Sequence, residues 1–264
     1  IYSGAKPDFV DIDKETYNID LYKLEKKIKF YLSKRKKVKA IISTDFAGNP
    51  CDWKVLRKIG KKYNIKIIND NCHAIGATYN KDRSYAVKFA DVVTHSYHPV
   101  KNITTGEGGA VLSNNKKICD RIRILRTHGI EKGNKKNGPW FYEMRSLGFN
   151  YRITDIQCAL GISQLRKINI FLKKRNLIAQ IYNESFKNNE LFKIPKVKKN
   201  CMHAYHFYPL QINFEKIKIS KRVLFKKLEK RNIKLQVHYI PVHLHPYYKK
   251  KFGFRKGNFP VAEK

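Results

Sequence analysis

Cysteine is sparse in this sequence, and its five cysteines form no recognisable framework. They are Cys51, Cys72, Cys119, Cys158 and Cys201. Their odd number and wide spacing, without a CxxC pair, exclude a disulfide-stapled scaffold and favour a reducing cytoplasm. A histidine cluster, His238, His243 and His245, has no cysteine or carboxylate spacing beside it that resembles a zinc site, so no bound metal is predicted.

Long hydrophobic runs are also absent. No apolar stretch approaches the roughly 18 residues of a membrane-spanning helix, and the first residues lack the basic and apolar regions of a signal peptide. We therefore expect a cytoplasmic protein that does not associate with membranes. With 264 residues, 42% of them hydrophobic, the chain is long and apolar enough to bury a substantial core.

Acidic residues are scarce: 21 Asp and Glu face 56 Lys and Arg, which gives a net charge of +35. Such an excess suggests nucleic acid or an anionic surface as a partner. However, 43 of the cations are lysines scattered along the chain. The densest runs, 34–37 and 196–199, lack the interleaved aromatics that stack on bases. Solvated faces explain the charge more simply, so a basic binding protein is kept as the alternative function.

The known glycine motifs for phosphate are missing as well. The segment Thr104–Gly109 contains neither GxxxxGK[ST] nor GxGxxG, which argues against a P-loop or a Rossmann dinucleotide site. A tight hairpin turn accounts for these glycines.

Strand and helix signals alternate through the first two-thirds of the chain. Helical spacing after Asp20, a strand over 38–43, a helix after Asp52 and a strand over 65–68 predict a right-handed β-α-β unit. A strand over 91–97 is followed by a hairpin partner over 109–112 and a helix over 116–126. This alternation predicts an α/β fold with a parallel sheet.

The last third reads differently. Thr154 and Gln157 have the spacing of a capping box, and a long helix is predicted from there towards Phe186. Strands over 205–212 and 236–239 around a helix over 221–230 predict a smaller α+β unit. We expect a large domain over 1–165 and a small C-terminal domain over 166–264.

The residues that follow the strands carry the chemistry, because ligands of open α/β sheets bind beyond the carboxyl ends of the strands. Asp70 and His73 follow one strand, whereas Ser96 and Lys101 follow another. Pyridoxal phosphate needs a lysine amine, an acid at its pyridine nitrogen and donors for its phosphate. Lys101, Asp70 and Ser96 supply one of each. On spacing alone, a solvated lysine and a turn-forming aspartate remain an open alternative.

Several ordered motifs resemble one protein family. They are Asp70–Ala77, Ser96–Lys101, Thr105–Val111 and Leu147–Gln157. Together they closely resemble the DegT/DnrJ/EryC1/StrS family of pyridoxal-phosphate-dependent sugar aminotransferases. The opening segment Gly4–Asp13 and the closing segment His238–His243 also look like that family, so the resemblance covers essentially the whole chain. It implies an aspartate-aminotransferase-like large domain of fold type I and a smaller α+β C-terminal domain.

The resemblance also implies roles for individual residues. Lys101 would be catalytic, binding pyridoxal 5'-phosphate as a Schiff base and moving a proton between cofactor and sugar. Asp70 would bind the pyridinium nitrogen, His73 would lie against the ring, and Ser96 would bind the phosphate. Asn150 would reach the cofactor phosphate of the neighbouring subunit, which implies a homodimer.

His238 lies in a segment that resembles the sugar-nucleotide side of the site and would bind substrate. A buried structural histidine is the alternative there. Some relatives that carry His at the position of Lys101 perform dehydration, so the lysine favours transamination.

One loop indicates the substrate. Residues 137–143, joined to 147–157, most resemble the members of pseudaminic acid biosynthesis. Those members transfer the amino group of glutamate to the 4-keto carbon of a UDP-linked 6-deoxy-N-acetylhexosamine. Glutamate and a nucleotide sugar are therefore the expected partners. Transaminases of the perosamine or 4-amino-arabinose type remain alternatives.

The resemblance further predicts that both ends are missing. The family's SGTxAL-like phosphate-binding motif does not occur in the sequence, and relatives continue beyond the position of Lys264 into a final helix and strand. We expect an internal fragment with both domains truncated, which by itself binds cofactor poorly.

Overall fold

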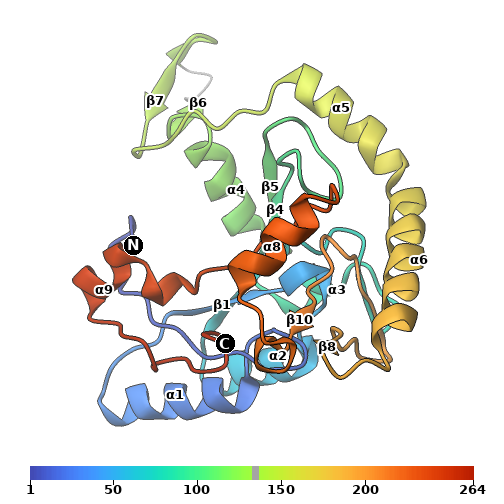
Figure 1. The fold of residues 1–264 in the computed structure, drawn as a ribbon. Helices are drawn as coiled ribbons and strands as arrows, with labels where there is room; N and C mark the ends of the chain where they lie inside the picture. The colour runs from blue at the N-terminus through green and yellow to red at the C-terminus, as the bar shows by residue number, and fades with distance from the viewer. Residues whose placement is uncertain (133–136) are drawn as a thin grey trace. The chain divides into compact units, whose positions relative to one another are not determined.

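A computed structural model describes residues 1–132 and 137–264 (Figure 1). The chain divides into two compact units. The sheet unit comprises Lys39–Lys173 and Asn200–His206, and the terminal unit comprises Ile1–Val38, Lys174–Lys199 and Phe207–Lys264. The two units interleave along the chain, whereas the expected domains divide it once, after residue 165; that boundary stays a prediction.

A four-stranded sheet organises the sheet unit. Its strands, in spatial order, are β1 (Ala40–Thr44), β2 (Lys66–Asp70), β4 (Val92–Ser96) and β5 (Gly109–Leu112). The first three are parallel, and β5 runs antiparallel to β4. The predicted β-α-β unit and the predicted hairpin are both confirmed.

Apolar side chains of α2 (Trp53–Lys62) form the core of this unit with the central strands. Trp53 and Leu56 on the helix are fully buried, as are Ile67 on β2 and Val93 on β4. The helix begins where expected, because the Asp52 carboxylate accepts the amide of Val55. Burial of these side chains provides the main driving force for closing the unit.

The predicted long helix after Thr154 is two helices. α5 (Asp155–Arg166) begins with a complete capping box between Thr154 and Gln157. α6 (Ile168–Phe186) follows after Lys167, whose amide donates to the carbonyls of Gln164 and Leu165 instead of continuing the α-helical ladder. The helical residues were predicted correctly, and the break between the two helices was not predicted.

Short elements complete the sheet unit. They are η1 (Phe46–Gly48), β3 (Thr78–Tyr79), α3 (Tyr85–Phe89), α4 (Lys116–Leu125), β6 (Ile130–Lys132), β7 (Tyr142–Met144) and β9 (Cys201–Met202). The pairing of β3 with β9 brings residues 200–206, which are remote in sequence, against the loop after β1. β6 and β7 form an antiparallel pair.

The terminal unit joins both ends of the chain. Its elements are α1 (Leu21–Ser33), β8 (Phe192–Lys193), β10 (Gln211–Ile212), α7 (Phe214–Ile217), α8 (Lys221–Glu229), η3 (Val242–Leu244) and α9 (Pro246–Phe252). The buried Asp11 carboxylate accepts the amides of Val261 and Ala262 and pairs with Lys23 of α1 at 3.0 Å. Burial raises the pKa of Asp11, and these donors outweigh it and lower the pKa overall.

Two strand predictions were wrong. Within residues 205–212 only Gln211–Ile212 is a strand, and residues 236–239 contain none. A strand needs a neighbouring backbone to pair with, which an apolar pattern does not supply. The amide of His206 instead donates to the carbonyl of Ala47, in the loop after β1.

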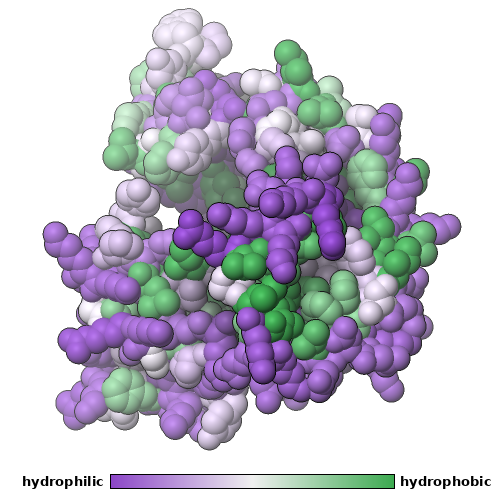
Figure 2. Space-filling view, viewed as in Figure 1, coloured by the Kyte–Doolittle hydropathy of each residue, from purple (hydrophilic) through white to green (hydrophobic). Residues whose placement is uncertain are grey.

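Charge is concentrated on exposed helix surfaces. α8 has nine residues, including Lys221, Arg222, Lys226 and Lys227. Figure 2 shows hydrophilic side chains gathered over this helix. A solvated face of this kind agrees with the simpler interpretation of the net charge.

Candidate active site

The candidate site lies at the carboxyl edge of the parallel strands. Asp70 is the last residue of β2, and Ser96 is the last residue of β4. The ladder places Asp70 next to Thr44 on one side and Thr94 on the other. The structure therefore brings these two strand ends to one edge, where open α/β sheets bind their ligands.

The Asp70 carboxylate is held by neighbouring donors. Its Oδ1 accepts the amide of Cys72 at 3.2 Å, and its Oδ2 accepts the hydroxyl of Thr44 at 3.5 Å. Its backbone carbonyl accepts the amide of Asp45 at 3.1 Å. These bonds orient a half-buried acid at the edge of the sheet.

Asp70 and Lys101 both influence the Cys72 thiol. Burial, followed by the hydrogen bond and the charge of Asp70, raises the pKa of Cys72 to about 12. The positive charge of Lys101 acts on the same thiol in the opposite direction. The charges of an acid and an amine thus both act on a thiol that stays protonated at neutral pH.

Lys101 follows a loop that is anchored at both ends. The Ser96 hydroxyl accepts the amide of His98 at 3.4 Å, and the amide of Lys101 donates to the His98 carbonyl at 3.0 Å. The next residue, Asn102, is buried and donates to the carbonyls of Ile75 and Ala204. The loop therefore fixes the backbone from which the lysine amine extends.

His73 has a defined orientation. Its Nδ1 accepts the amide of Ala47 at 3.3 Å, so the neutral ring carries its proton on Nε2. The ring of His206 lies against it, with centroids 4.4 Å apart. His73 therefore presents an Nε2–H donor from a ring with one face already covered.

Gly48 permits the close approach behind His73. Its φ is +101°, and a Cβ there would lie 2.8 Å from the His73 carbonyl oxygen and 3.0 Å from the Ala204 Cβ. The carbonyl of Gly48 also accepts the amide of Ala204. Only glycine fits both the backbone conformation and the space.

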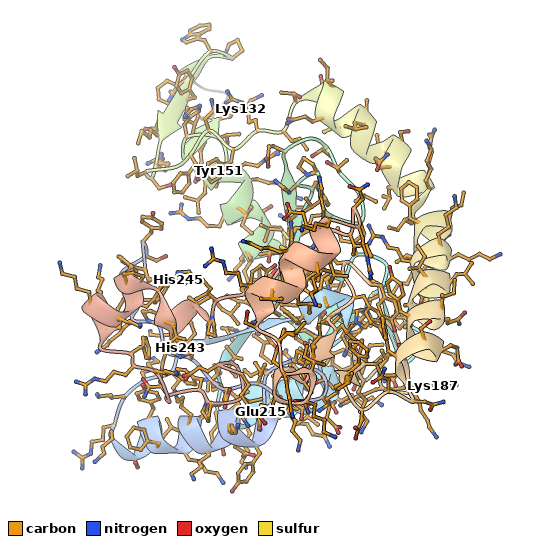
Figure 3. All side chains as sticks on the ribbon, in the orientation of Figure 1. Lys132, Tyr151, Lys187, Glu215, His243 and His245 are labelled. Atoms are coloured by element: carbon orange, nitrogen blue, oxygen red, sulfur yellow. The ribbon has the colours of Figure 1, made fainter. Side chains whose placement is uncertain are left out.

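The contacts of Asn150 and His238 are with other residues. Asn150 is exposed in the sheet unit and forms a backbone bridge with Thr127. The rings of its chain neighbours Phe149 and Tyr151 (the latter labelled in Figure 3) stack on each other, with centroids 4.7 Å apart. His238 belongs to the terminal unit, where its ring stacks on Phe207 at 4.4 Å. Their roles remain predictions.

Sequence reasoning missed the residues that support this edge. Thr44 ends β1 and could have been found by the same strand-end rule that identified Asp70. Cys72 and Asp45 gave no signal of their own. His206 comes from a segment remote in sequence, which the pairing of β3 with β9 and the backbone bonds to Ala47 and Gly48 hold at this edge.

The assembled groups fit pyridoxal phosphate. A carboxylate held by donors suits a protonated ring nitrogen, an imidazole suits a ring face, and an amine and a hydroxyl follow the neighbouring strand. Their roles toward the cofactor stay predictions.

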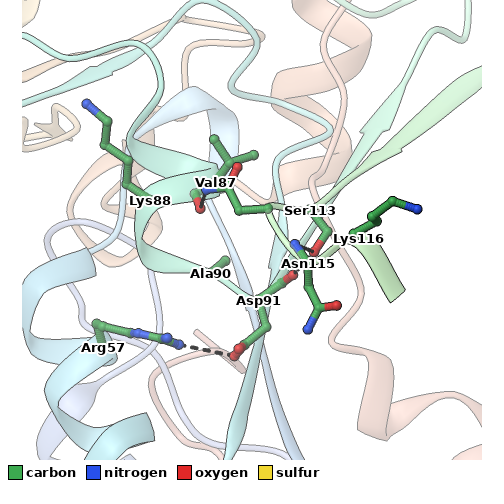
Figure 4. A pocket seen from close by; sticks show the side chains of 9 residues that line it. Arg57, Val87, Lys88, Ala90, Asp91, Ser113, Asn115 and Lys116 are labelled. Atoms are coloured by element: carbon green, nitrogen blue, oxygen red, sulfur yellow. Dashed lines mark hydrogen bonds and ion pairs between the residues drawn. The ribbon is translucent and has the colours of Figure 1, made fainter. Parts of the chain in front are cut away.

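Two other features are explained without a ligand. A hollow of about 500 Å³ near the start of β4 is lined by Arg57, Asp91, Lys88 and Lys116 (Figure 4). Its cations already face carboxylates: Arg57 pairs with Asp91, Lys88 with Asp82 and Lys116 with Asp120.

In the histidine cluster, the His243 Nε2 bonds the Glu263 carboxylate at 2.8 Å, and His245 precedes α9 (Figure 3). Residues 1–132 and 137–264 contain no group of three residues able to hold a metal ion. Over the same residues, no helix has both the length and the apolar character needed to cross a membrane.

Comparison with known proteins gives concordant results. The model of the DegT/DnrJ/EryC1/StrS aminotransferase family matches residues 1–264. An uncharacterized protein of Methanocaldococcus jannaschii is 44% identical over 100% of this chain and 67% of its own length. The UDP-4-amino-4,6-dideoxy-N-acetyl-beta-L-altrosamine transaminase of Campylobacter jejuni is 41% identical over 100% of this chain and 68% of its own.

Solved structures agree with the fold. PseC of Helicobacter pylori, an aminotransferase involved in the biosynthesis of pseudoaminic acid, has a TM-score of 0.87 at 33% identity. The match covers 99% of this chain and 66% of that one. The chain thus spans about two thirds of the length of the relatives it matches.

Proposed function

Because this chain belongs to the DegT/DnrJ/EryC1/StrS aminotransferase family, we propose that it aminates a nucleotide-linked keto sugar. The substrate proposed is a UDP-linked 4-keto-6-deoxy-N-acetylhexosamine, with glutamate as the amino donor. The observation that carries this substrate is the 41% identity to the altrosamine transaminase over the whole chain. The structural match to PseC supports a place in the synthesis of pseudaminic acid or a related cell-surface sugar.

Pyridoxal phosphate is the cofactor of this family, and when bound it supplies a ring that withdraws electrons from the carbon that loses its proton. Asp70, His73, Ser96 and Lys101 are the residues proposed to hold it. The Asp70 carboxylate keeps a proton on the ring nitrogen, and Thr44 and Cys72 keep that carboxylate in place.

The remaining residues bind the cofactor and move a proton. The Lys101 Nζ would hold the cofactor covalently and, once the amine of glutamate has displaced it, would take the proton from the reacting carbon and return it. His73 would lie against the ring, with its proton fixed on Nε2 by the amide of Ala47. The Ser96 hydroxyl donates to the phosphate while it accepts the amide of His98.

We also propose a homodimer in which Asn150 reaches the phosphate in the neighbouring subunit. Many large apolar side chains are exposed near Asn150 in sequence and on α5. They include Tyr142, Met144, Leu147, Phe149, Tyr151, Ile156, Leu160, Ile162 and Leu165. Apolar surface on this scale is typical of a surface that a partner covers. His238 is proposed to contact the sugar nucleotide, and its stacking on Phe207 orients its ring.

An amination assay tests the proposal. The full-length protein, loaded with pyridoxal phosphate, is incubated with glutamate and the UDP-linked 4-keto sugar. We expect equal amounts of 2-oxoglutarate and 4-amino sugar, detected by mass spectrometry. Lys101→Ala should abolish both products, whereas Lys117→Ala, a change at an exposed lysine of α4, should not. Amination of perosamine-type or 4-amino-arabinose-type precursors alone would reassign the substrate.

A further inference from the structure

A buried carboxylate beneath the site takes no part in the proposed chemistry. Asp45 follows β1, and its side chain is 0% exposed. Its carboxylate accepts hydrogen bonds from the backbone amide of Cys51, the indole of Trp53, the side-chain amides of Asn69 and Asn71, and the hydroxyl of Tyr85. Burial raises the pKa of Asp45, and the hydrogen bonds oppose that rise. A fully buried carboxylate is costly unless donors surround it, so these hydrogen bonds offset the cost of burying Asp45.

The two carboxylate oxygens face different parts of the unit. Oδ1 accepts the amide of Cys51 at 2.8 Å and the indole N–H of Trp53 at 3.0 Å. This oxygen therefore holds the start of α2. Oδ2 accepts the Tyr85 hydroxyl at 2.7 Å and the side-chain amides of Asn71 at 2.9 Å and Asn69 at 3.2 Å. This second oxygen holds the end of β2.

Two of the residues held by Oδ2, Asn69 and Asn71, flank Asp70 in the chain. Side chains alternate along a strand, so Asn69 points to the side of the sheet opposite Asp70. The amide of Asp45 also donates to the backbone carbonyl of Asp70 at 3.1 Å. Asp45 thus fixes the backbone before, at and after Asp70.

We propose that Asp45 is a positioning residue: through Oδ2 it clamps Asn69 and Asn71 and so holds the Asp70 carboxylate where it meets the ring nitrogen of pyridoxal phosphate. This inference rests on the proposed function. In this proposal the bonds of Oδ1 stabilise the fold, whereas the bonds of Oδ2 control how Asp70 stabilises the proton on the ring nitrogen.

The test is a double-mutant cycle read from the bound cofactor. The visible absorbance of the cofactor-loaded, full-length protein is titrated with pH in the wild type, Asp45→Asn, Asp70→Asn and the double variant. In Asp45→Asn an NH2 group replaces one acceptor oxygen, so a donor then faces the donors of the neighbouring side chains and a hydrogen bond is lost. We expect the midpoint of the absorbance titration in Asp45→Asn to move in the same direction as in Asp70→Asn. The expected shift is about half a pH unit or more, a threefold change in proton affinity.

In the Asp70→Asn background, Asp45→Asn should cause no further shift, because the effect acts through Asp70. An equal shift in both backgrounds, or a wild-type midpoint in Asp45→Asn, overturns the inference. Trp53→Phe is the matched control. It removes a donor to Oδ1 only and should lower thermal stability while leaving the midpoint unchanged.

Two further arms cover other failures. If Asp45→Asn does not fold, Asn71→Ala removes the link at Oδ2 and leaves Asp45 in place. It should shift the midpoint, and a wild-type midpoint there rejects the clamp. If the wild type binds no cofactor, the proposed function fails. If the wild type and Asp70→Asn titrate as expected and the Asp45 variant matches the wild type, only this inference fails.

Discussion

Among single residues, His203 shows how burial makes the stability of the fold depend on pH. Its side chain is 2% exposed, its Nδ1 accepts the Tyr205 amide at 2.8 Å, and its ring stacks on Tyr205 at 3.9 Å. Burial lowers the pKa of His203 to about 3, from an ordinary value of 6.5. A proton added at Nδ1 would also break the bond from the Tyr205 amide.

The protein is therefore expected to lose stability in acid through this residue. Below pH 6.5 the unfolded chain binds a proton that the folded chain does not, so the free energy of unfolding falls as pH falls towards about 3. The slope is about 1.4 kcal/mol per pH unit. His203→Asn can still accept the Tyr205 amide. Urea unfolding between pH 4 and 6 should show a shallower slope for this variant, and an equal slope would contradict the assignment.

The strand-end rule predicted that Asp70 and Ser96 lie at one edge of the sheet, and it did so for a physical reason. Asp70 and Ser96 end parallel strands, and such ends meet at one edge whatever the rest of the sequence. Asp45 and Cys72 could not be recognised in this way. Their roles depend on which donors the folded chain brings to them, and the local sequence does not encode that.

At the scale of elements, α5 is coupled to the loop that follows Lys101. Its capping box satisfies the first turn through Thr154 and Gln157. The Gln157 side chain also donates to the carbonyl of Glu107 at 2.9 Å. One glutamine therefore both starts the helix and holds the 104–109 turn.

Because Gln157 has both roles and Thr154 has only one, variants at the two positions should differ. Thr154→Ala loses the cap, which costs about 1 kcal/mol of stability. Gln157→Ala loses part of the cap and also the bond to Glu107. We expect hydrogen exchange to accelerate in the first turn of α5 in both variants, and in residues 104–108 in Gln157→Ala only. Equal exchange in that turn for both variants would show that the bond to Glu107 does not hold it.

Elements defined by local signals were predictable. The capping box predicted the start of α5, and Asp20 and Asp52 cap the N-termini of α1 and α2 as expected. Elements that need a remote partner were not. β3 and β9 are two residues each and exist only because they pair. Residues 205–210 and 236–239 have strand-like composition, but they form no ladder.

At the scale of the whole molecule, composition was a poor guide to partners. The charge of +35 suggested a polyanion, whereas the family is one of aminotransferases. The arrangement of the chain was also beyond local patterns. The N-terminal 38 residues fold with the C-terminal segment, through contacts such as those of Asp11 with Val261 and Ala262.

The proposed homodimer makes a prediction at this scale. Ile156 on α5 is 85% exposed and Tyr22 on α1 is 78% exposed. If the apolar side chains of α5 lie in the interface, Ile156→Lys should turn the dimer into a monomer and weaken cofactor binding at least tenfold, a loss of about 1.4 kcal/mol. Tyr22→Lys is the control and should remain dimeric. Sedimentation velocity measures both, and a dimeric Ile156→Lys with full cofactor affinity would refute this interface.

The covalent attachment of the cofactor at Lys101 is the central claim. The most direct measurement loads the full-length protein with pyridoxal phosphate, records its visible spectrum before and after glutamate, reduces it with borohydride and maps the modified peptide by mass. We predict a visible band that glutamate bleaches and a single stable adduct on Lys101. No band, or an adduct on another lysine, would contradict the account and favour a basic binding protein on the same fold.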